Sequence, residues 1–315
     1  MIGLKKIAVT TGDTDGIGLE VTVKALSKVG PQKGSSFYLF RSPTSSKSQL
    51  KLLDNKFDRK VVSSLEEALK LKSFSSQIIE IVNEKPPAFW VEDSARLCFE
   101  KKMDSMVTAP LSKQSILDAG LCDIGHTDIL KRVSGSKNAF MGFFGKYFNV
   151  ILASAHIPIN QVEDYLTVEI LSQATATSLK ARNYLSPSNR KKPIGILGLN
   201  PHAGDGGLIG NFDENFLKKY TGSKNFTGPL VPDIAFIKSN WSRYSFFLAL
   251  YHDQGLIPFK TVHGFDSGAH ITLGLPIRRS SVDHGTAKDL FGKNMANPGS
   301  MIEAIKWGVK LCTIR

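Results

Sequence analysis

The sequence predicts an α/β fold built on a mainly parallel sheet. Short apolar runs of strand length alternate with longer stretches of helical periodicity, which is typical of βαβ units. Of the 315 residues, 42% are hydrophobic and 22% are charged, as in a globular protein with a substantial core. A chain of this length holds two domains or one large α/β unit.

The expected elements begin with a strand over 5–11, a glycine-rich turn over Gly12–Gly18 and a helix that starts near Leu19. Residues 34–80 are rich in serine and lysine. Because their hydrophobic periodicity is weaker, it does not define the helices and strands of this region. The pattern further predicts a strand at 105–110, a helix around 116–117, a helical stretch over 162–184, a strand at 271–275 and a closing amphipathic helix at 299–312.

Three histidines each stand just after an apolar run that is typical of a buried strand. His156 closes the run from Val150, while His202 and His252 follow two later runs. In a parallel α/β sheet, ligands bind outside the carboxyl ends of the strands. Imidazole is a common zinc ligand, and three protein ligands with one open position describe a catalytic metal site. The three histidines therefore predict a metal site, with a buried core role for each as the alternative.

Other polar residues near these strand ends are candidates for binding or catalysis. Asp253 would orient its neighbour His252, whereas Asp205 is as compatible with a polar loop as with a role in a metal site. A lysine at such a place is most often exposed, but near a metal it holds a phosphate or carboxylate as a point charge. The remaining candidates are Lys113, His126, Thr127, Lys260, Arg278, Arg279, Asp283 and His284, while His263 is expected to be structural or exposed.

Two glycine-rich loops would allow the backbone to approach a ligand closely. Asn200–Gly207 has more glycine than a plain turn needs. Gly12–Gly18 has the composition of a phosphate-binding loop, but it matches neither the GxGxxG nor the Walker pattern. It is therefore weak evidence for nucleotide binding.

The formal net charge of +12 does not by itself indicate a nucleic-acid partner. The lysines are scattered, and the one tight basic cluster, Arg190–Lys192, has no aromatic residues among it. No apolar run is long enough to span a membrane, and the N-terminus lacks a secretory signal. Three cysteines without metal-type spacing favour reduced thiols. We therefore expect a cytoplasmic protein that binds neither nucleic acid nor membrane.

Several segments together resemble the 4-hydroxythreonine-4-phosphate dehydrogenase family of vitamin B6 biosynthesis. They occur in the family's order and cover the chain from residue 7 to its end, with 30–95 the least similar. The Asn-Pro-His and Tyr-His-Asp-Gln-Gly segments are highly specific. The matching segments are Val107–Lys113, Gly125–Thr127, Leu199–Gly207, Tyr251–Lys260, Ile271–Pro276 and Ser281–Ala287.

The resemblance implies a fold like that of isocitrate and isopropylmalate dehydrogenases. Two α/β/α domains would flank a cleft, and the active site would be completed across a homodimer. We expect a discontinuous cofactor-side domain over 1–120 plus 260–315. The metal, substrate and dimerisation domain would span 121–259.

The resemblance also implies roles for particular residues. His156, His202 and His252 would bind a divalent ion such as zinc, cobalt or magnesium, one of them from the second subunit. NAD or NADP would bind without a Rossmann fingerprint, and Asn297 is a candidate cofactor contact because 284–298 is similar to a loop of isopropylmalate dehydrogenase. The substrate would contact His126, Thr127, Lys260, His270 and Arg279, with Lys260 and Asp253 as the catalytic candidates and the general base left open.

The implied reaction is the oxidation and decarboxylation of 4-phosphohydroxy-L-threonine to 3-amino-2-oxopropyl phosphate. A hydride leaves a secondary alcohol, and the resulting β-keto acid then loses CO₂. A divalent ion suits both steps, because it lowers the pKa of the alcohol and stabilises the enolate. The basic residues would hold the phosphate and carboxylate in place for hydride transfer.

The chain departs from the family pattern in its first loop, at His270 and over 84–104. Thr14, Asp15 and Leu19 replace Pro, Ala and Pro, so that Asp15 adds a negative charge. His270 stands where a substrate-binding Asn is expected, and the segment 84–104 is short enough to predict a trimmed helix. These changes leave related substrates open: 4-phosphorylated threonate or erythronate, or a dihydrodiol dicarboxylate. A nonenzymatic basic binding protein is the alternative from another class.

Overall fold

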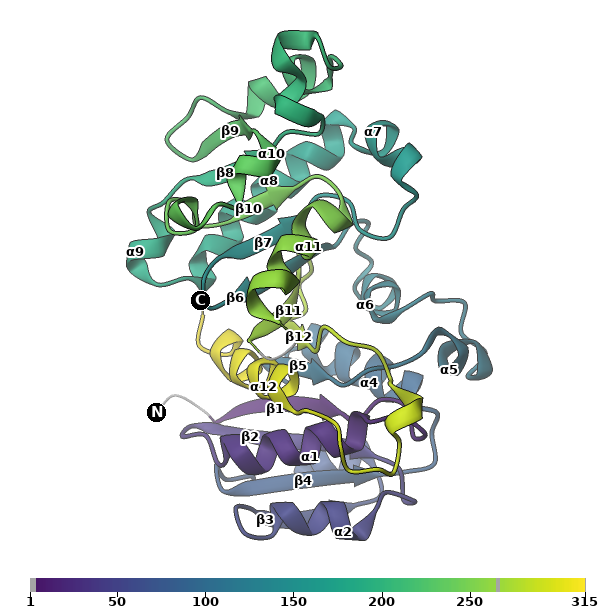
Figure 1. Ribbon diagram of the computed structural model, residues 1–315. Coiled ribbons are helices and arrows are strands. Elements are labelled where there is room, and N and C mark those ends of the chain that lie inside the picture. The colour runs from purple at the N-terminus through teal and green to yellow at the C-terminus, as the bar shows by residue number, and fades with distance from the viewer. Residues whose placement is uncertain (1–3, 265–266, 315) are drawn as a thin grey trace. The chain divides into compact units, whose positions relative to one another are not determined.

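The structure is a computed structural model that describes residues 4–264 and 267–314. It has two compact units (Figure 1): 4–139 together with 267–314, and Phe140–Gly264. The boundaries differ from the expected 120/121 and 259/260. Helix α6 (His126–Ser134) packs on α4 (Pro87–Phe99) of the first unit, and α11 (His252–His263) continues unbroken past residue 260 in the second.

In the first unit, the strands lie in the order β3-β4-β2-β1-β5-β12-β11. Neighbouring strands run parallel, except that β11 and β12 are antiparallel. Parallel pairing places the carboxyl ends of β1, β2 and β5 at one edge. The strands are β1 (Lys5–Thr10), β2 (Ser35–Arg41), β3 (Asp58–Val62), β4 (Gln77–Val82), β5 (Ser105–Thr108), β11 (Gly268–Leu273) and β12 (Arg279–Ser281).

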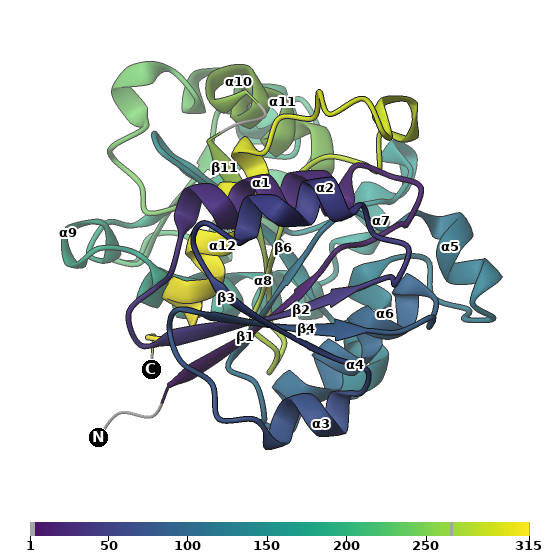
Figure 2. The same ribbon diagram turned by 90° about the horizontal axis from the view of Figure 1, so that it is seen from below.

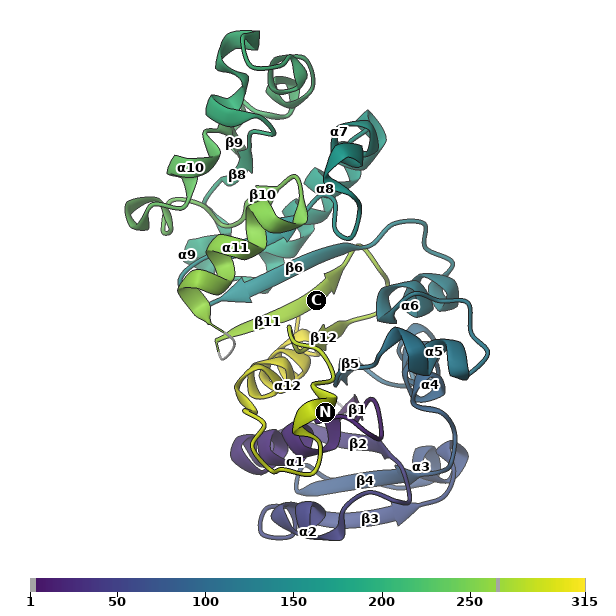
Figure 3. The same cartoon turned by 45° about the vertical axis from the view of Figure 1, so that its right-hand side comes forward.

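Helices cover both faces of this sheet, as Figure 2 shows. Side chains alternate between the faces of a strand, so Ile7 and Val9 of β1 pack with α1 (Gly18–Val29) and α12 (Gly299–Leu311). Ala8 points to the opposite core, which α4 and α6 cover. The shorter helices of the unit are α2 (Lys47–Leu50), α3 (Leu65–Lys70) and α5 (Lys113–Asp118); Figure 3 shows α4, α5 and α6 grouped together.

In the second unit, the strand order is β6-β7-β10-β8-β9, and only the β6–β7 pair is antiparallel. Its core is rich in phenylalanine, with Phe148 packed against Phe247 and against Phe259 of α11. The strands are β6 (Phe140–Gly145), β7 (Asn149–Leu152), β8 (Ile194–Leu197), β9 (Phe226–Leu230) and β10 (Phe247–Ala249). The other helices are α7 (Val162–Tyr165), α8 (Val168–Ala181), α9 (Pro187–Arg190) and α10 (Pro232–Ala235).

The structure bears on three local predictions. The helical stretch over 162–184 breaks before α8, where the Thr167 hydroxyl accepts a hydrogen bond from the Ile170 N–H and caps the new helix. The segment 84–104 carries α4, which has 13 residues, and a helix shorter than that of the relatives stays a prediction. His263 is structural: it is 5% exposed, and its Nε2 accepts the Tyr147 N–H at 3.1 Å. Among the described helices, none has the length and apolar character of a membrane span.

Candidate active site

His156 and His252 come together in the second unit. Strands β7 and β10 are parallel neighbours, so the segments that follow them leave the sheet at the same edge. The two imidazole centroids lie 5.5 Å apart at an interplanar angle of 45°. Both rings line a hollow of about 550 Å³ together with Tyr251 and Asp253. The His252 Nδ1 lies 2.6 Å from Asp253 Oδ1, so this carboxylate orients the ring.

His202 lies on the loop after β8 and does not join this pair. Among residues 4–264 and 267–314, no three His, Cys, Asp or Glu side chains form a group that could hold a metal. His202 is exposed, on a backbone that is left-handed from His202 to Gly206. Among the described residues, the structure therefore brings together two of the three predicted histidine ligands, whose nitrogen donors suit a divalent ion.

The buried carboxylate of Asp213 anchors the loop that carries His202. It accepts the backbone N–H of Leu199 at 2.6 Å and that of Asn200 at 3.2 Å, and also the Asn200 side-chain amide at 2.9 Å. The sequence analysis missed Asp213, because it stands six residues beyond the glycine-rich segment. The sequence feature that could have identified it is an acidic residue after the Asn-Pro-His loop, because the backbone N–H groups of that loop need acceptors.

Lys260 lies two turns after His252 on the same face of α11. Both residues line a second hollow of about 570 Å³ with Asp253, Leu256 and Ile257. The structure thus places Lys260 and Asp253, the two catalytic candidates, in one hollow with His252, and Asp253 also lines the hollow of the histidine pair. Lys113, in contrast, is an exposed residue at the start of α5 in the first unit.

Arg279 is a buried cation in the first unit. Its guanidinium is held by hydroxyls on neighbouring strands: Thr108 Oγ1 accepts from Nε at 3.1 Å and from Nη2 at 2.9 Å, and Thr272 Oγ1 accepts from Nη1 at 2.9 Å. The side chain is 3% exposed, and within the described part of the chain no carboxylate pairs with it. Burial lowers the pKa of Arg279 to about 9, so it remains charged at neutral pH. A buried positive charge surrounded by neutral groups favours an anionic ligand.

His126 and Thr127 form the first turn of α6, beside this cation. The helix begins at Gly125 without a side-chain cap, so its first N–H groups are available to an anion. Burial, and secondly the charge of Arg279, lower the pKa of His126, which keeps the ring neutral. Its buried Nε2 has no hydrogen-bond partner among the described residues. Arg279, His126 and Thr127 together have the features of an anion site.

His270 lies on β11, directly opposite Ser281 of β12. It is 5% exposed, and its Nδ1 is 2.9 Å from the Ser281 hydroxyl. The imidazole is thus fixed by a neighbouring strand in the same sheet as Arg279. Its position is compatible with the predicted substrate contact.

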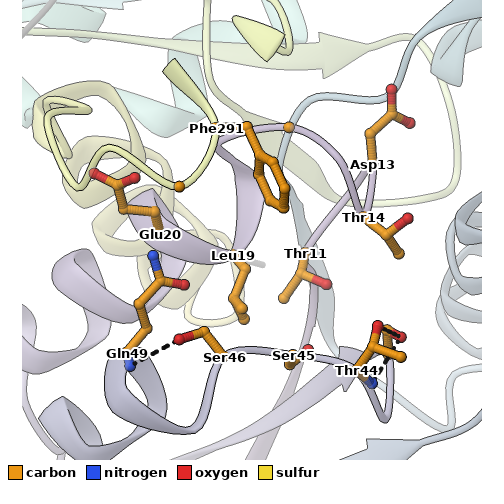
Figure 4. Close-up of a pocket in the computed structure, with 13 residues that line it drawn as sticks. Thr11, Asp13, Thr14, Leu19, Glu20, Thr44, Ser45, Ser46, Gln49 and Phe291 are labelled. Atoms are coloured by element: carbon orange, nitrogen blue, oxygen red, sulfur yellow. Dashed lines mark hydrogen bonds between the residues drawn. The ribbon is translucent and has the colours of Figure 1, made fainter. Parts of the chain in front are cut away.

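Asn297 and Ile17 line an open hollow of about 1230 Å³ together with His284, Gly285 and Ala287. This surface is mostly apolar, as an adenosine site requires. Another hollow of about 570 Å³ lies at the carboxyl ends of β1 and β2 (Figure 4), and its lining includes Thr11, Thr14, Leu19 and Phe291. Asp13, another residue that the sequence analysis missed, is buried beside it and accepts the Ser112 N–H at 3.2 Å.

Comparison with known proteins identifies the family. The model of the pyridoxal phosphate biosynthetic protein PdxA matches residues 49–308. A 4-hydroxythreonine-4-phosphate dehydrogenase of Sulfurihydrogenibium sp. (strain YO3AOP1) is 35% identical, over 98% of this chain and 99% of the relative. The crystal structure of the Klebsiella pneumoniae enzyme of that name superimposes with a TM-score of 0.78 at 26% identity, over 98% of each chain.

A more distant likeness concerns the fold alone. A β-decarboxylating dehydrogenase from Thermococcus kodakarensis has a TM-score of 0.51 at 15% identity, over 98% of this chain and 82% of the other. The predicted fold class, which grouped the chain with isocitrate and isopropylmalate dehydrogenases, is confirmed. The chain belongs to the PdxA family of pyridoxal phosphate biosynthetic proteins.

Proposed function

We propose that the chain is an NAD(P)-dependent 4-hydroxythreonine-4-phosphate dehydrogenase, an oxidoreductase of pyridoxal phosphate biosynthesis. It oxidises and decarboxylates 4-phosphohydroxy-L-threonine to 3-amino-2-oxopropyl phosphate. The family membership supports the reaction, because the relatives that match the whole chain carry this name. The observation that carries the substrate class is the buried Arg279 without a carboxylate partner in the described chain.

Arg279 binds the substrate phosphate together with the first turn of α6. A guanidinium offers donors in a fixed fork that matches phosphate oxygens. Thr127 adds a hydroxyl, and the His126 Nε2 supplies a further polar contact. Thr108 and Thr272 hold the guanidinium in place before the substrate arrives. This preorganisation favours an anionic group at this position, and the names of the relatives support a phosphate there rather than the carboxylate of a dihydrodiol dicarboxylate.

His156 and His252 would hold a divalent ion, with the third histidine ligand, His202, supplied by the second subunit of a homodimer. The ion would supply Lewis acidity, which lowers the pKa of the substrate alcohol. Asp253 fixes the His252 ring, and Lys260 places a positive charge on the same side of α11 for the substrate carboxylate. Zinc, cobalt and magnesium are the candidate ions.

NAD or NADP would bind against the loop 284–298, with Asn297 as a contact and Ile17 as part of the apolar wall. Its nicotinamide would supply the acceptor for the hydride of the substrate alcohol. The cytoplasm is the proposed location, in keeping with cysteines that form no disulfide within the described chain.

A substrate panel tests the proposal. Purified protein is assayed for NADH or NADPH formation with 4-phosphohydroxy-L-threonine, 4-phosphoerythronate and 4-phosphothreonate, and its metal content is measured. We expect turnover of the phosphohydroxythreonine, and metal loss in His252→Ala. The control is His263→Gln at the other end of α11, which keeps the metal. No turnover of phosphohydroxythreonine alongside turnover of a phosphorylated sugar acid would move the proposal to that substrate. Salt-dependent DNA binding without metal would support a nonenzymatic protein.

A further inference from the structure

The loop His284–Pro298, here named the cofactor loop, runs beside the β1–α1 turn and α1 of the first unit (Figure 1). Its two ends are joined at the base, where the Ser300 hydroxyl donates to Asp283 Oδ1 at 2.8 Å and accepts the Asp283 N–H at 3.2 Å. Between these ends only a short turn over Lys288–Leu290 is helical. The position of the loop therefore depends on contacts with neighbouring elements.

Helix α1 holds the far part of the cofactor loop. Glu20, which is buried, accepts the Ala296 N–H at 2.7 Å, and it is paired with Lys24 at the same distance. Lys24 in turn donates to the carbonyls of Asn294 and Ala296 at 3.0 and 3.2 Å. These bonds fix the backbone immediately before Asn297.

The β1–α1 turn holds the near part of the loop through one backbone bond and one ion pair. The Ile17 N–H donates to the Thr286 carbonyl at 3.0 Å. The Lys288 ammonium lies 2.7 Å from Asp15 and 4.0 Å from Asp13. Asp15 is the charged residue by which the first loop departs from the family pattern, and its partner is a lysine of the cofactor loop. The hydrogen bond to Asp15 raises the pKa of Lys288, and the coulombic attraction between the two charges raises it further.

We infer that Asp15 is a positioning residue for the cofactor: through Lys288 it holds the near half of the cofactor loop in the arrangement that binds NAD or NADP. The inference rests on the proposed function. The negative charge of Asp15 departs from the family pattern. We assign this charge to cofactor binding rather than to the choice of substrate. Asp15 and Lys288 are both exposed, so their ion pair contributes weakly to the position of the loop. Glu20 and Lys24 hold its far part more firmly.

A double-mutant cycle tests the assignment. Asp15→Ala, Lys288→Ala and the double variant are compared for the dissociation constant of NADH, measured by fluorescence without substrate, and for KM of the phosphorylated substrate. Exposed ion pairs are weak, so we expect each single variant to raise the NADH dissociation constant about two- to fivefold, and the double variant to be no worse. The effect should shrink at 0.5 M salt because the pair is screened. KM for the substrate should stay unchanged, and the exchanged pair Asp15→Lys with Lys288→Asp should restore binding.

A matched control and a cofactor-independent measurement complete the design. Lys293→Ala removes the same charge from an exposed position of the loop that has no ion pair in the described chain; its NADH binding should be unchanged. Hydrogen exchange of 286–291 in the ligand-free protein should be faster in Asp15→Ala. Additive effects in the cycle, or a change confined to the substrate KM, would overturn the assignment. If the unaltered protein binds neither NADH nor NADPH, the proposed function fails. The Asp15 assignment then fails with it. The hydrogen-exchange measurement, which needs no cofactor, shows in that case whether the ion pair still holds the loop, so that the two failures can be told apart.

Discussion

Replacing Arg279 with methionine should make the free protein no less stable while weakening phosphate binding. The fall of the Arg279 pKa from the ordinary arginine value to about 9 is roughly three and a half pH units, and at about 1.4 kcal/mol per unit the buried charge costs about 5 kcal/mol. The three hydrogen bonds to Thr108 and Thr272 offset this cost, because each hydrogen bond to a charged group contributes about 1.5–3 kcal/mol. Methionine fills similar space without a charge, so the free energy of unfolding should change little.

The same substitution removes the cation that the phosphate needs. A hydrogen bond to a charged group contributes about 1.5–3 kcal/mol, so KM for a phosphorylated substrate should rise by a factor of about 10–100. Inorganic phosphate at a hundred times its dissociation constant should stabilise the unaltered protein by about 2.7 kcal/mol, and the variant, which binds 10–100 times more weakly, by only about 0.4–1.4 kcal/mol.

Thermal and urea unfolding, with and without phosphate, check both expectations. Arg278→Met is the matched control, because that neighbouring arginine donates to the Ile314 carbonyl and lies outside the anion site. It should keep the phosphate response. A strongly destabilised Arg279→Met that gains as much stability from phosphate as the unaltered protein would refute the reasoning, since the guanidinium would then be a structural group.

The remaining predictions concern the second unit. Burial lowers the pKa of His263, so neutral His263 adds stability above its unfolded-state pKa of about 6.5, and that stability is lost as the pH falls below it; urea unfolding at pH 7.5 and 5 should show a smaller loss in His263→Gln. Gly145→Ala would place a Cβ against the His263 ring and should cost about 1–3 kcal/mol by the same assay, whereas an unchanged midpoint would show that the ring can move. Asp213→Ala leaves the Leu199 and Asn200 donors without their acceptor and should cost about 1–3 kcal/mol, with Asp213→Asn showing whether the charge or the shape matters.

The sequence predicted those parts of the fold that depend on local periodicity. β1, β5 and α12 lie within a few residues of their expected positions, because each has a continuous apolar pattern. The sequence did not predict β2, β3 and β4 as separate strands within the serine- and lysine-rich region. Their ladder depends on pairing between distant segments, and β3 shows only Val62 buried.

The candidate site was predictable where residues follow strand ends and was missed where a partner is distant in sequence. The meeting of His156 and His252 follows from parallel neighbours, but strand order alone did not show that His202 stays apart. Thr108 and Asp213 have ordinary sequence contexts and gain their roles only from the strand pairing and loop path.

The left-handed backbone around His202 restricts the conformation of this loop and also lowers its stability. His202, Ala203 and Asp205 all have positive φ, a region that costs a residue with a Cβ about 1–2 kcal/mol. Glycine at Ala203 or Asp205 would relieve this cost, yet it would also widen the range of directions in which the imidazole can point. The loop therefore keeps a less stable sequence, and the chain obtains a histidine with a restricted orientation.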